Sequence, residues 1–150
     1  MKKSAHIKQQ LERLLESQNF AVLATHNLAQ PYASLVAFVA CPDLKQVLFA
    51  TTRSTRKYAN LSADNRAAML VDSRTNQDSD ISQAVAVTAT GRTDEVLPEE
   101  KEHLLQLYLK KHPHLKEFVH SPTCALLRLK VDTYYFVNRF QEVFELHINE

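Results

Sequence analysis

Hydrophobic residues recur along this chain with two different periods, and each period predicts a different kind of element. Ile7, Leu11, Leu14 and Leu15 repeat at helical spacing opposite a polar face, which predicts an amphipathic helix near the N-terminus. Shorter apolar segments rich in β-branched and aromatic residues follow, and turn residues separate them. Strands are expected at 19–26, 32–41, 46–52, 66–74, 84–96, 124–140 and 142–148, with helices starting near residue 54, at 98–112 and at 113–122.

Many strands at short spacing, with few helices between them, favour an antiparallel barrel over a parallel α/β sheet. The chain is therefore expected to be one mainly β domain with flanking helices, spanning residues 1–150. The segment 33–40 is apolar at almost every position, so both of its faces need cover. A barrel interior would cover one face, and either a packed helix or a second copy of the chain would cover the other.

Composition narrows the classes of function. The formal net charge of +1 provides no broad basic surface for nucleic acid and no polybasic segment for a membrane. No stretch approaches the roughly 20 apolar residues that cross a bilayer, and the N-terminus lacks the apolar core of a secretory signal. Cys41 and Cys124 are the only cysteines, too few for a disulfide framework. Both are interpreted as reduced and buried in a cytoplasmic protein.

Gly91 is the only glycine in the chain. Loops that wrap a phosphate in backbone N–H groups need several glycines, so a P-loop and a dinucleotide fingerprint are excluded. A phosphate would have to be held by side chains and a helix N-terminus instead.

The segment 51–57, TTRSTRK, has this character, with four hydroxyls, three cations and no acid between a strand and a short helix. Ser54 or Thr55 can cap that helix, whose free N–H groups and dipole would point at one spot. Arg56 and Lys57 add two charges there, although cations oppose the dipole at a helix N-terminus. A solvated loop is the simpler interpretation, and a phosphate site is the alternative that explains the mismatch.

An ordered series of short motifs over about residues 18–96 resembles the pyridoxamine 5′-phosphate oxidase-like FMN-binding split barrels. The series comprises Pro31, Ser34 and Val36; Phe49 and Thr51; Thr55, Arg56 and Lys57; and Asn60, Leu61, Asn65 and Arg66. The resemblance implies an antiparallel split β-barrel that binds FMN in a cleft between the two subunits of a homodimer.

The resemblance also assigns roles to particular residues. Arg56 and Lys57 would bind the FMN phosphate, and Thr51 and Thr55 would add hydroxyl hydrogen bonds. The isoalloxazine edge would be lined by Ser34, Leu35 and Val36 on one strand and by Phe49, Ala50 and Thr51 on its neighbour. No side chain is expected to be an obligatory catalytic acid or base, because the chemistry belongs to the cofactor.

The chain departs from the true pyridoxine-phosphate oxidases, which carry a C-terminal Arg-x-His element and a Trp near the cofactor. It has no Trp and ends in EVFELHINE. The expected function is therefore FMN-dependent transfer of hydride or electrons from a reduced nicotinamide, NADH or NADPH, to a small acceptor. The alternatives are a flavin- or haem-binding module for storage or sensing, and a haem-degrading barrel in which His147 takes part.

A metal site is the last alternative. His112, His114, His120 and Cys124 lie within thirteen residues. Pro113 between two histidines at the end of a helix is more typical of an exposed surface loop, so no metal is expected.

Overall fold

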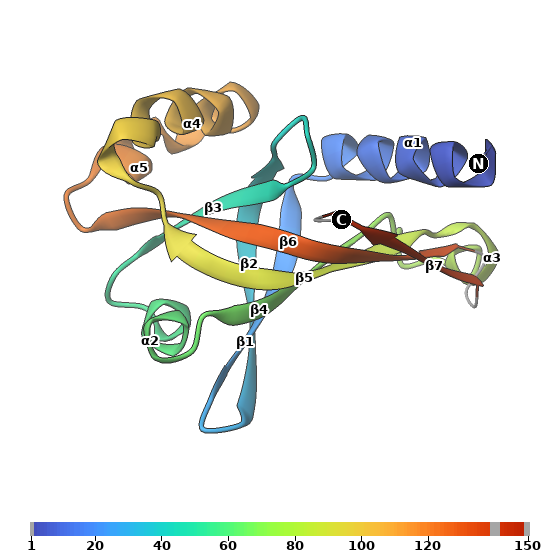
Figure 1. Cartoon of the computed structure of the whole chain (residues 1–150), viewed down its shortest axis with the longest axis horizontal. Coiled ribbons are helices and arrows are strands. Elements are labelled where there is room, and N and C mark those ends of the chain that lie inside the picture. The colour runs from blue at the N-terminus through green and yellow to red at the C-terminus, as the bar shows by residue number, and fades with distance from the viewer. Residues whose placement is uncertain (1, 139–141, 149–150) are drawn as a thin grey trace.

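The structure is a computed structural model that describes residues 2–138 and 142–148. Its elements follow the expected order, apart from a short helix at 80–83 in a segment expected to be a polar loop (Figure 1). The strands are β1 (Phe20–Asn27), β2 (Gln30–Ala40), β3 (Gln46–Thr52), β4 (Arg66–Asp72), β5 (Ala86–Glu95), β6 (Cys124–Asn138) and β7 (Glu142–His147). The helices are α1 (Lys2–Ser17), α2 (Arg56–Ala63), α3 (Asp80–Gln83), α4 (Pro98–Lys111), the 3₁₀ turn η1 (Pro113–Leu115) and α5 (Lys116–His120). The expected extension of the strand at 124–140 to residues 139 and 140 lies outside the described residues. None of the described helices is long and apolar enough to span a membrane.

The strands form a closed antiparallel barrel, which confirms the predicted fold class. Their order is β3-β2-β1-β4-β5-β6, and β3 also pairs with β6 to close six strands into a ring. β7 pairs with β6 outside this ring, because β6 is long enough for both partners. Its first part, up to Lys130, pairs with β3, and the part from Thr133 onward pairs with β7.

Alternate residues of the strands fill the barrel, and α1 contributes its apolar face to the same core. Phe38, Phe49 and Leu23 are fully buried within this cluster, as the period-2 pattern requires. The buried side chains from α1 are Ile7, Leu11, Leu14 and Leu15. Leu61 of α2 joins the cluster as well, and in Figure 1 α1 and α2 lie on opposite sides of the barrel strands.

A second core lies outside the barrel, where α4 and α5 pack on the outer faces of β2, β3 and β6. Val39 and Leu48 are buried there with Tyr108 of α4. The Tyr108 hydroxyl donates a 3.0 Å hydrogen bond to the Ala37 carbonyl, which fixes α4 on β2. Leu35, two residues before Ala37 on the same outer face, is 66% exposed. A helix therefore covers one end of the doubly apolar segment, and no described part of the chain covers the other.

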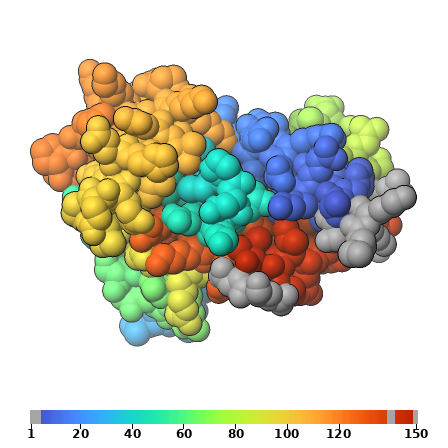
Figure 2. Space-filling model, turned by 45° about the horizontal axis from the view of Figure 1, so that its top comes forward, coloured from blue at the N-terminus to red at the C-terminus, as the bar shows by residue number. Residues whose placement is uncertain are grey.

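α1 and α4 meet beside the turn between β2 and β3. Figure 2 shows α4 (orange), this turn (turquoise) and α1 (blue) side by side, and a cavity of about 400 Å³ lies among them. Lys111 lines this cavity, and its Nζ donates a 2.9 Å hydrogen bond to the Leu15 carbonyl. The same Nζ lies 4.1 Å from the centroid of the Phe38 ring. Burial lowers the pKa of the Lys111 amine to about 8. Lys111 thus joins the end of α1 to α4 at the cost of partly desolvating a charge.

Gly91 lies at a β-bulge, where the register between β5 and β6 shifts after Thr90. A Cβ atom at this position would be 1.9 Å from the Lys130 carbonyl oxygen. The only glycine of the chain is thus required by the close approach of two backbones.

Candidate functional site

The barrel splits between β2 and β3, and this split positions the candidate site. The two strands are paired only from Ala40/Val47 to Phe38/Phe49. β3 then continues beside β6 as far as Thr52 opposite Cys124, while β2 continues beside β1. α2 begins directly after β3, so its N-terminus lies where the two strands have parted.

Two threonine hydroxyls meet at the start of α2. Of the two predicted caps, Ser54 and Thr55, the structure shows Thr55 as the N-cap, with extended backbone and an Oγ1 that accepts a 3.3 Å hydrogen bond from the Tyr58 N–H. The Thr51 Oγ1 lies 2.8 Å from the Thr55 Oγ1. Thr51 itself is buried. The first turn of α2 contains no acidic residue, so the positive end of the helix dipole faces this hydroxyl pair without a protein anion.

The three cations of TTRSTRK have different roles. The Arg53 guanidinium forms a 2.7 Å ion pair with Glu95 and donates hydrogen bonds to the Pro122 and Cys124 carbonyls. It therefore ties the loop after β3 to β5 and to the start of β6. Among the described residues, neither Arg56 nor Lys57 has a carboxylate within ion-pair distance.

Arg56 and Lys57 are placed differently at this helix start. Arg56 is exposed, and its guanidinium carbon lies 5.9 Å from the centroid of the Tyr32 ring on β2. Lys57 is partly buried, and this burial lowers the pKa of its amine. Both positive charges are therefore available to an anion, and one of them is partly removed from water.

The residues expected beside a flavin ring divide into two groups. Val36 and Phe49 point into the barrel core, so only their backbone atoms are free to face a ligand. Ala50 is half-buried, and Leu35 is exposed on the outer face. The Ser34 Oγ is a buried hydroxyl oxygen without a hydrogen-bond partner.

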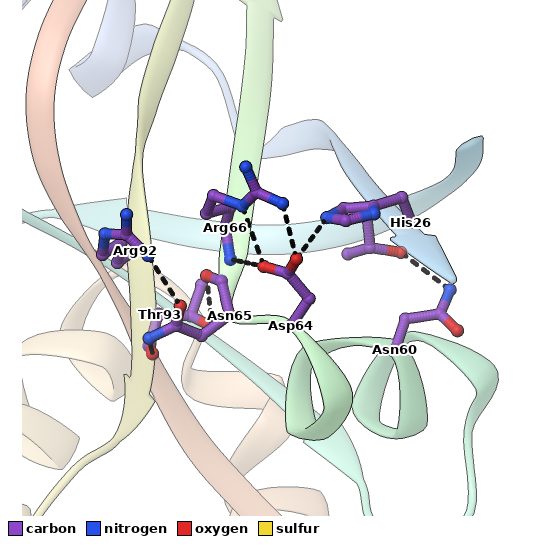
Figure 3. Close-up of polar contacts among 8 residues, drawn as sticks. His26, Asn60, Asp64, Asn65, Arg66, Arg92 and Thr93 are labelled. Carbon is purple, nitrogen blue, oxygen red and sulfur yellow. Dashed lines mark hydrogen bonds and ion pairs between the residues drawn. The ribbon is translucent and has the colours of Figure 1, made fainter. Parts of the chain in front are cut away.

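The structure also adds contacts that the sequence did not reveal (Figure 3). Asn60 donates a buried 3.0 Å hydrogen bond to the Thr25 hydroxyl and so holds α2 against β1. The Asp64 carboxylate, at the C-cap of α2, lies 2.7 Å from the Arg66 guanidinium and 3.1 Å from the His26 Nε2. Hydrogen bonds from Arg66 hold the pKa of Asp64 well below its usual range. Each contact joins segments that only the fold brings together, apart from the local pair of Asp64 and Arg66.

The histidines considered as metal ligands have other partners. His112, expected on an exposed loop, is buried instead, with its Nε2 2.8 Å from the Phe38 carbonyl oxygen. Burial lowers the pKa of this imidazole. The His120 Nδ1 lies 2.7 Å from the Lys116 carbonyl oxygen. Within residues 2–138 and 142–148, no group of three or more His, Cys, Asp or Glu is placed to hold a metal. Cys41 and Cys124 are free and buried, as expected.

A protein-family model described as Pyridoxamine 5′-phosphate oxidase matches residues 7–138. The chain belongs to the pyridoxamine 5′-phosphate oxidase family. The match covers the whole barrel from α1 to the end of β6. A comparison of the sequence with curated proteins finds no significant match.

Solved structures share this fold at low sequence identity. One is a haem-binding protein from Mycobacterium smegmatis, with a TM-score of 0.79, 17% identity and coverage of 90% of this chain and 55% of that chain. A second is ChuZ from Campylobacter jejuni, with a TM-score of 0.78, 14% identity and coverage of 95% and 60%. A third is an FAD-binding protein from Mesorhizobium loti, with a TM-score of 0.69, 14% identity and coverage of 86% and 90%. This chain therefore spans little more than half the length of the first two structures.

Proposed function

We propose that the chain binds FMN and acts as a flavin-dependent oxidoreductase, which transfers hydride or electrons from a reduced nicotinamide to a small acceptor. The observation that carries the proposal is the pair of cations at the N-terminus of α2. Arg56 and Lys57 have no carboxylate partner in the described structure, whereas the neighbouring Arg53 is fully engaged. A helix start that keeps two unpaired cations and no acid is arranged for an external anion.

A phosphate monoester suits this group of residues. It carries a charge near −2 at neutral pH and strong acceptor oxygens. Arg56 and Lys57 would supply charge-assisted hydrogen bonds, and the free N–H groups of the first turn of α2 would add neutral donors. Thr51 and Thr55 would hold their hydroxyls beside the phosphate, since their oxygens are already 2.8 Å apart.

The residues on β2 suit the ring system of the same ligand. The unpartnered Ser34 hydroxyl would gain a hydrogen-bond partner in a polar ring edge. When bound, FMN would supply the hydride- and electron-transfer chemistry, while the chain binds it, orients it and limits its contact with water. No side chain of the site is assigned as an acid or a base.

A second copy of the chain would complete the site. Leu35, Val22 and Leu70 lie directly opposite one another on β2, β1 and β4, and all three point outward. Phe20 extends this apolar patch and is 57% exposed. Exposed apolar patches of this kind mark interaction surfaces. A two-fold homodimer would cover the patch and create two equivalent cofactor sites.

Haem is the competing cofactor, because a haem-binding protein shares the fold and haem propionates could also bind Arg56 and Lys57. His147, the residue considered for the haem alternative, contacts the Thr133 hydroxyl at 3.0 Å and Glu145 at 3.3 Å. In Figure 1, β7, which carries His147, lies at the end of the molecule away from α2. Because His147 already has two partners and lies far from the α2 N-terminus of the same chain, it is poorly placed to bind a haem held by Arg56 and Lys57. This favours FMN over haem as the cofactor.

The test begins with the absorption spectrum of the purified protein, before and after addition of FMN to cofactor-free protein. The proposal expects a flavin spectrum, and anaerobic NADH or NADPH should then bleach it. A Soret band with no flavin uptake would favour haem. A colourless protein that does not bind added FMN would refute flavin binding. A bound flavin that neither NADH nor NADPH reduces would show that the chain is a flavin-binding module and not an enzyme.

A further inference from the structure

A row of cations crosses the outer face of the barrel at a distance from the α2 N-terminus. The strand register places Arg66 of β4 directly opposite Arg92 of β5, and Arg92 directly opposite Lys130 of β6. All three side chains are exposed. Like charges directly opposite each other destabilise a sheet, so this arrangement calls for a counter-charge.

The chain supplies only part of that counter-charge. Arg66 is paired with Asp64, and the Lys130 Nζ lies 3.1 Å from Asp94. Asp94 is shared with a further cation, Arg128. Arg92 lies between two cations, and within residues 2–138 and 142–148 its guanidinium donates a single hydrogen bond, of 3.4 Å, to the side-chain oxygen of Asn65. Figure 3 shows the Arg66 and Arg92 side chains next to one another, above the turn that carries Asp64 and Asn65.

A hollow of small residues adjoins this row. It is a shallow depression of about 500 Å³ that is open to solvent, and Arg66 and His26 are among the residues that line it. Its other lining residues are Ala24, Thr25, Ala29, Ala67 and Ala68. Short side chains leave room for a flat molecule to approach the sheet, and Arg66 belongs both to this hollow and to the cation row.

The chemical character of the outer face changes along the strand direction, in three successive bands. The apolar band of Val22, Leu35 and Leu70 comes first, then a band of alanines, and then the cation row. Arg66 is four residues from Leu70 on β4, which is about 13 Å along an extended strand. A homodimer built on the apolar band can therefore leave the cation row at its rim.

We infer that the Arg66–Arg92–Lys130 row binds the diphosphate of a nucleotide, with a ring of that nucleotide lying in the small-residue hollow. Neighbouring strands are about 4.8 Å apart, so the row spans about 10 Å. That length suits two linked phosphate groups better than one. Arginine is also the side chain that binds phosphate oxygens through a planar pair of N–H groups.

The row is too short, and the net charge of +1 too small, for a nucleic-acid surface. A reduced nicotinamide dinucleotide carries both the diphosphate and the flat rings. The assignment of this dinucleotide as the natural ligand rests on the proposed function. The diphosphate site itself rests only on the cation row and the hollow.

The experiment is a calorimetric titration with ADP, adenosine and inorganic diphosphate at low ionic strength. We expect ADP to bind, and adenosine and inorganic diphosphate each to bind at least about 10-fold more weakly than ADP. Arg92→Gln should weaken ADP binding about 10-fold through loss of one charge-assisted hydrogen bond. Lys8→Gln, at an exposed position on α1, removes the same charge and should change nothing. Native ADP affinity in Arg92→Gln would overturn the site, and equal affinity for inorganic diphosphate would overturn the role of the hollow.

Two further measurements separate this inference from the proposed function. Arg92→Gln should keep native FMN affinity, and Arg56→Ala/Lys57→Ala should keep native ADP affinity. If ADP binding were lost in Arg56→Ala/Lys57→Ala, ADP would be using the FMN phosphate site and the inference would be wrong. If the native protein bound ADP but not FMN, only the proposed function would fail.

Discussion

The Arg56 guanidinium carbon lies 5.9 Å from the centroid of the Tyr32 ring. This contact brings the first residue of α2 against β2, beyond the last residue pair that joins β2 to β3. A cation held over an aromatic face is attracted to it without being neutralised. Arg56 is thereby positioned at the split of the barrel while its charge stays available to a ligand.

The apolar band on the outer face predicts a homodimer that depends on Leu35. Leu35→Glu should weaken dimerisation by about 4 kcal/mol, because a two-fold interface loses two leucines at about 2 kcal/mol each. Sedimentation should show half the mass of the native protein, and flavin should be released with the change. Leu97→Glu is the matched control, since Leu97 is 49% exposed at the start of α4. A Leu35→Glu monomer that retained FMN at native affinity would show that one chain forms the whole site.

The bulge in β5 predicts that Gly91 cannot be replaced. Gly91→Ala places a Cβ 1.9 Å from the Lys130 carbonyl oxygen, and neither backbone can move without breaking the β5–β6 pairing. We expect the free energy of unfolding to fall by about 3 kcal/mol or more. Urea denaturation measures this change, with Ala89→Gly on the same strand as the control. A loss below about 1 kcal/mol would mean that the two strands can separate at this point.

The half-buried Lys111 predicts a rise in stability at alkaline pH. Its folded-state pKa of about 8 is below the usual lysine value of 10.5, so the unfolded chain binds more protons between these two values. The contribution of Lys111 to the free energy of unfolding should therefore increase as the pH rises from about 8 to 10.5. Lys111→Met removes the titrating group and should flatten this part of the curve. Denaturation of both proteins across this range isolates the effect, and parallel curves would contradict it.

The fold could be predicted from sequence because its signals are local. The period-2 segments, the amphipathic α1 and the Thr55 cap each depend on residues close together in the chain, and the ordered motifs indicated the family. The doubly apolar segment also indicated correctly that one face would need a cover, although not that α4 would cover Val39 and leave Leu35 exposed. That division depends on where α4 docks.

The parts of the site that depend on long-range contacts could not be predicted. Arg53 and Arg56 have similar neighbours in sequence, and their roles differ because Arg53 contacts Glu95, 42 residues away, and two carbonyls at the start of β6. His112 lies beside Pro113 at the end of a helix, and this position favours an exposed side chain. The imidazole is buried instead, because α4 packs so that the ring reaches the Phe38 carbonyl. The cation row requires the register of three strands, including the bulge after Thr90.

The most direct test of the account compares the affinities of FMN and riboflavin, which differ only in the phosphate. The native protein should bind FMN far more tightly than riboflavin. Arg56→Ala and Lys57→Ala should each lower the affinity for FMN by about 10- to 150-fold, because a charge-assisted hydrogen bond contributes roughly 1.5–3 kcal/mol. The affinity for riboflavin should hardly change in either variant. Arg53→Ala, which removes a structural cation of the same loop, should lower stability but keep the ratio of the two affinities. Unchanged FMN affinity in Arg56→Ala and Lys57→Ala would contradict the account, and TTRSTRK would then be only a solvated loop.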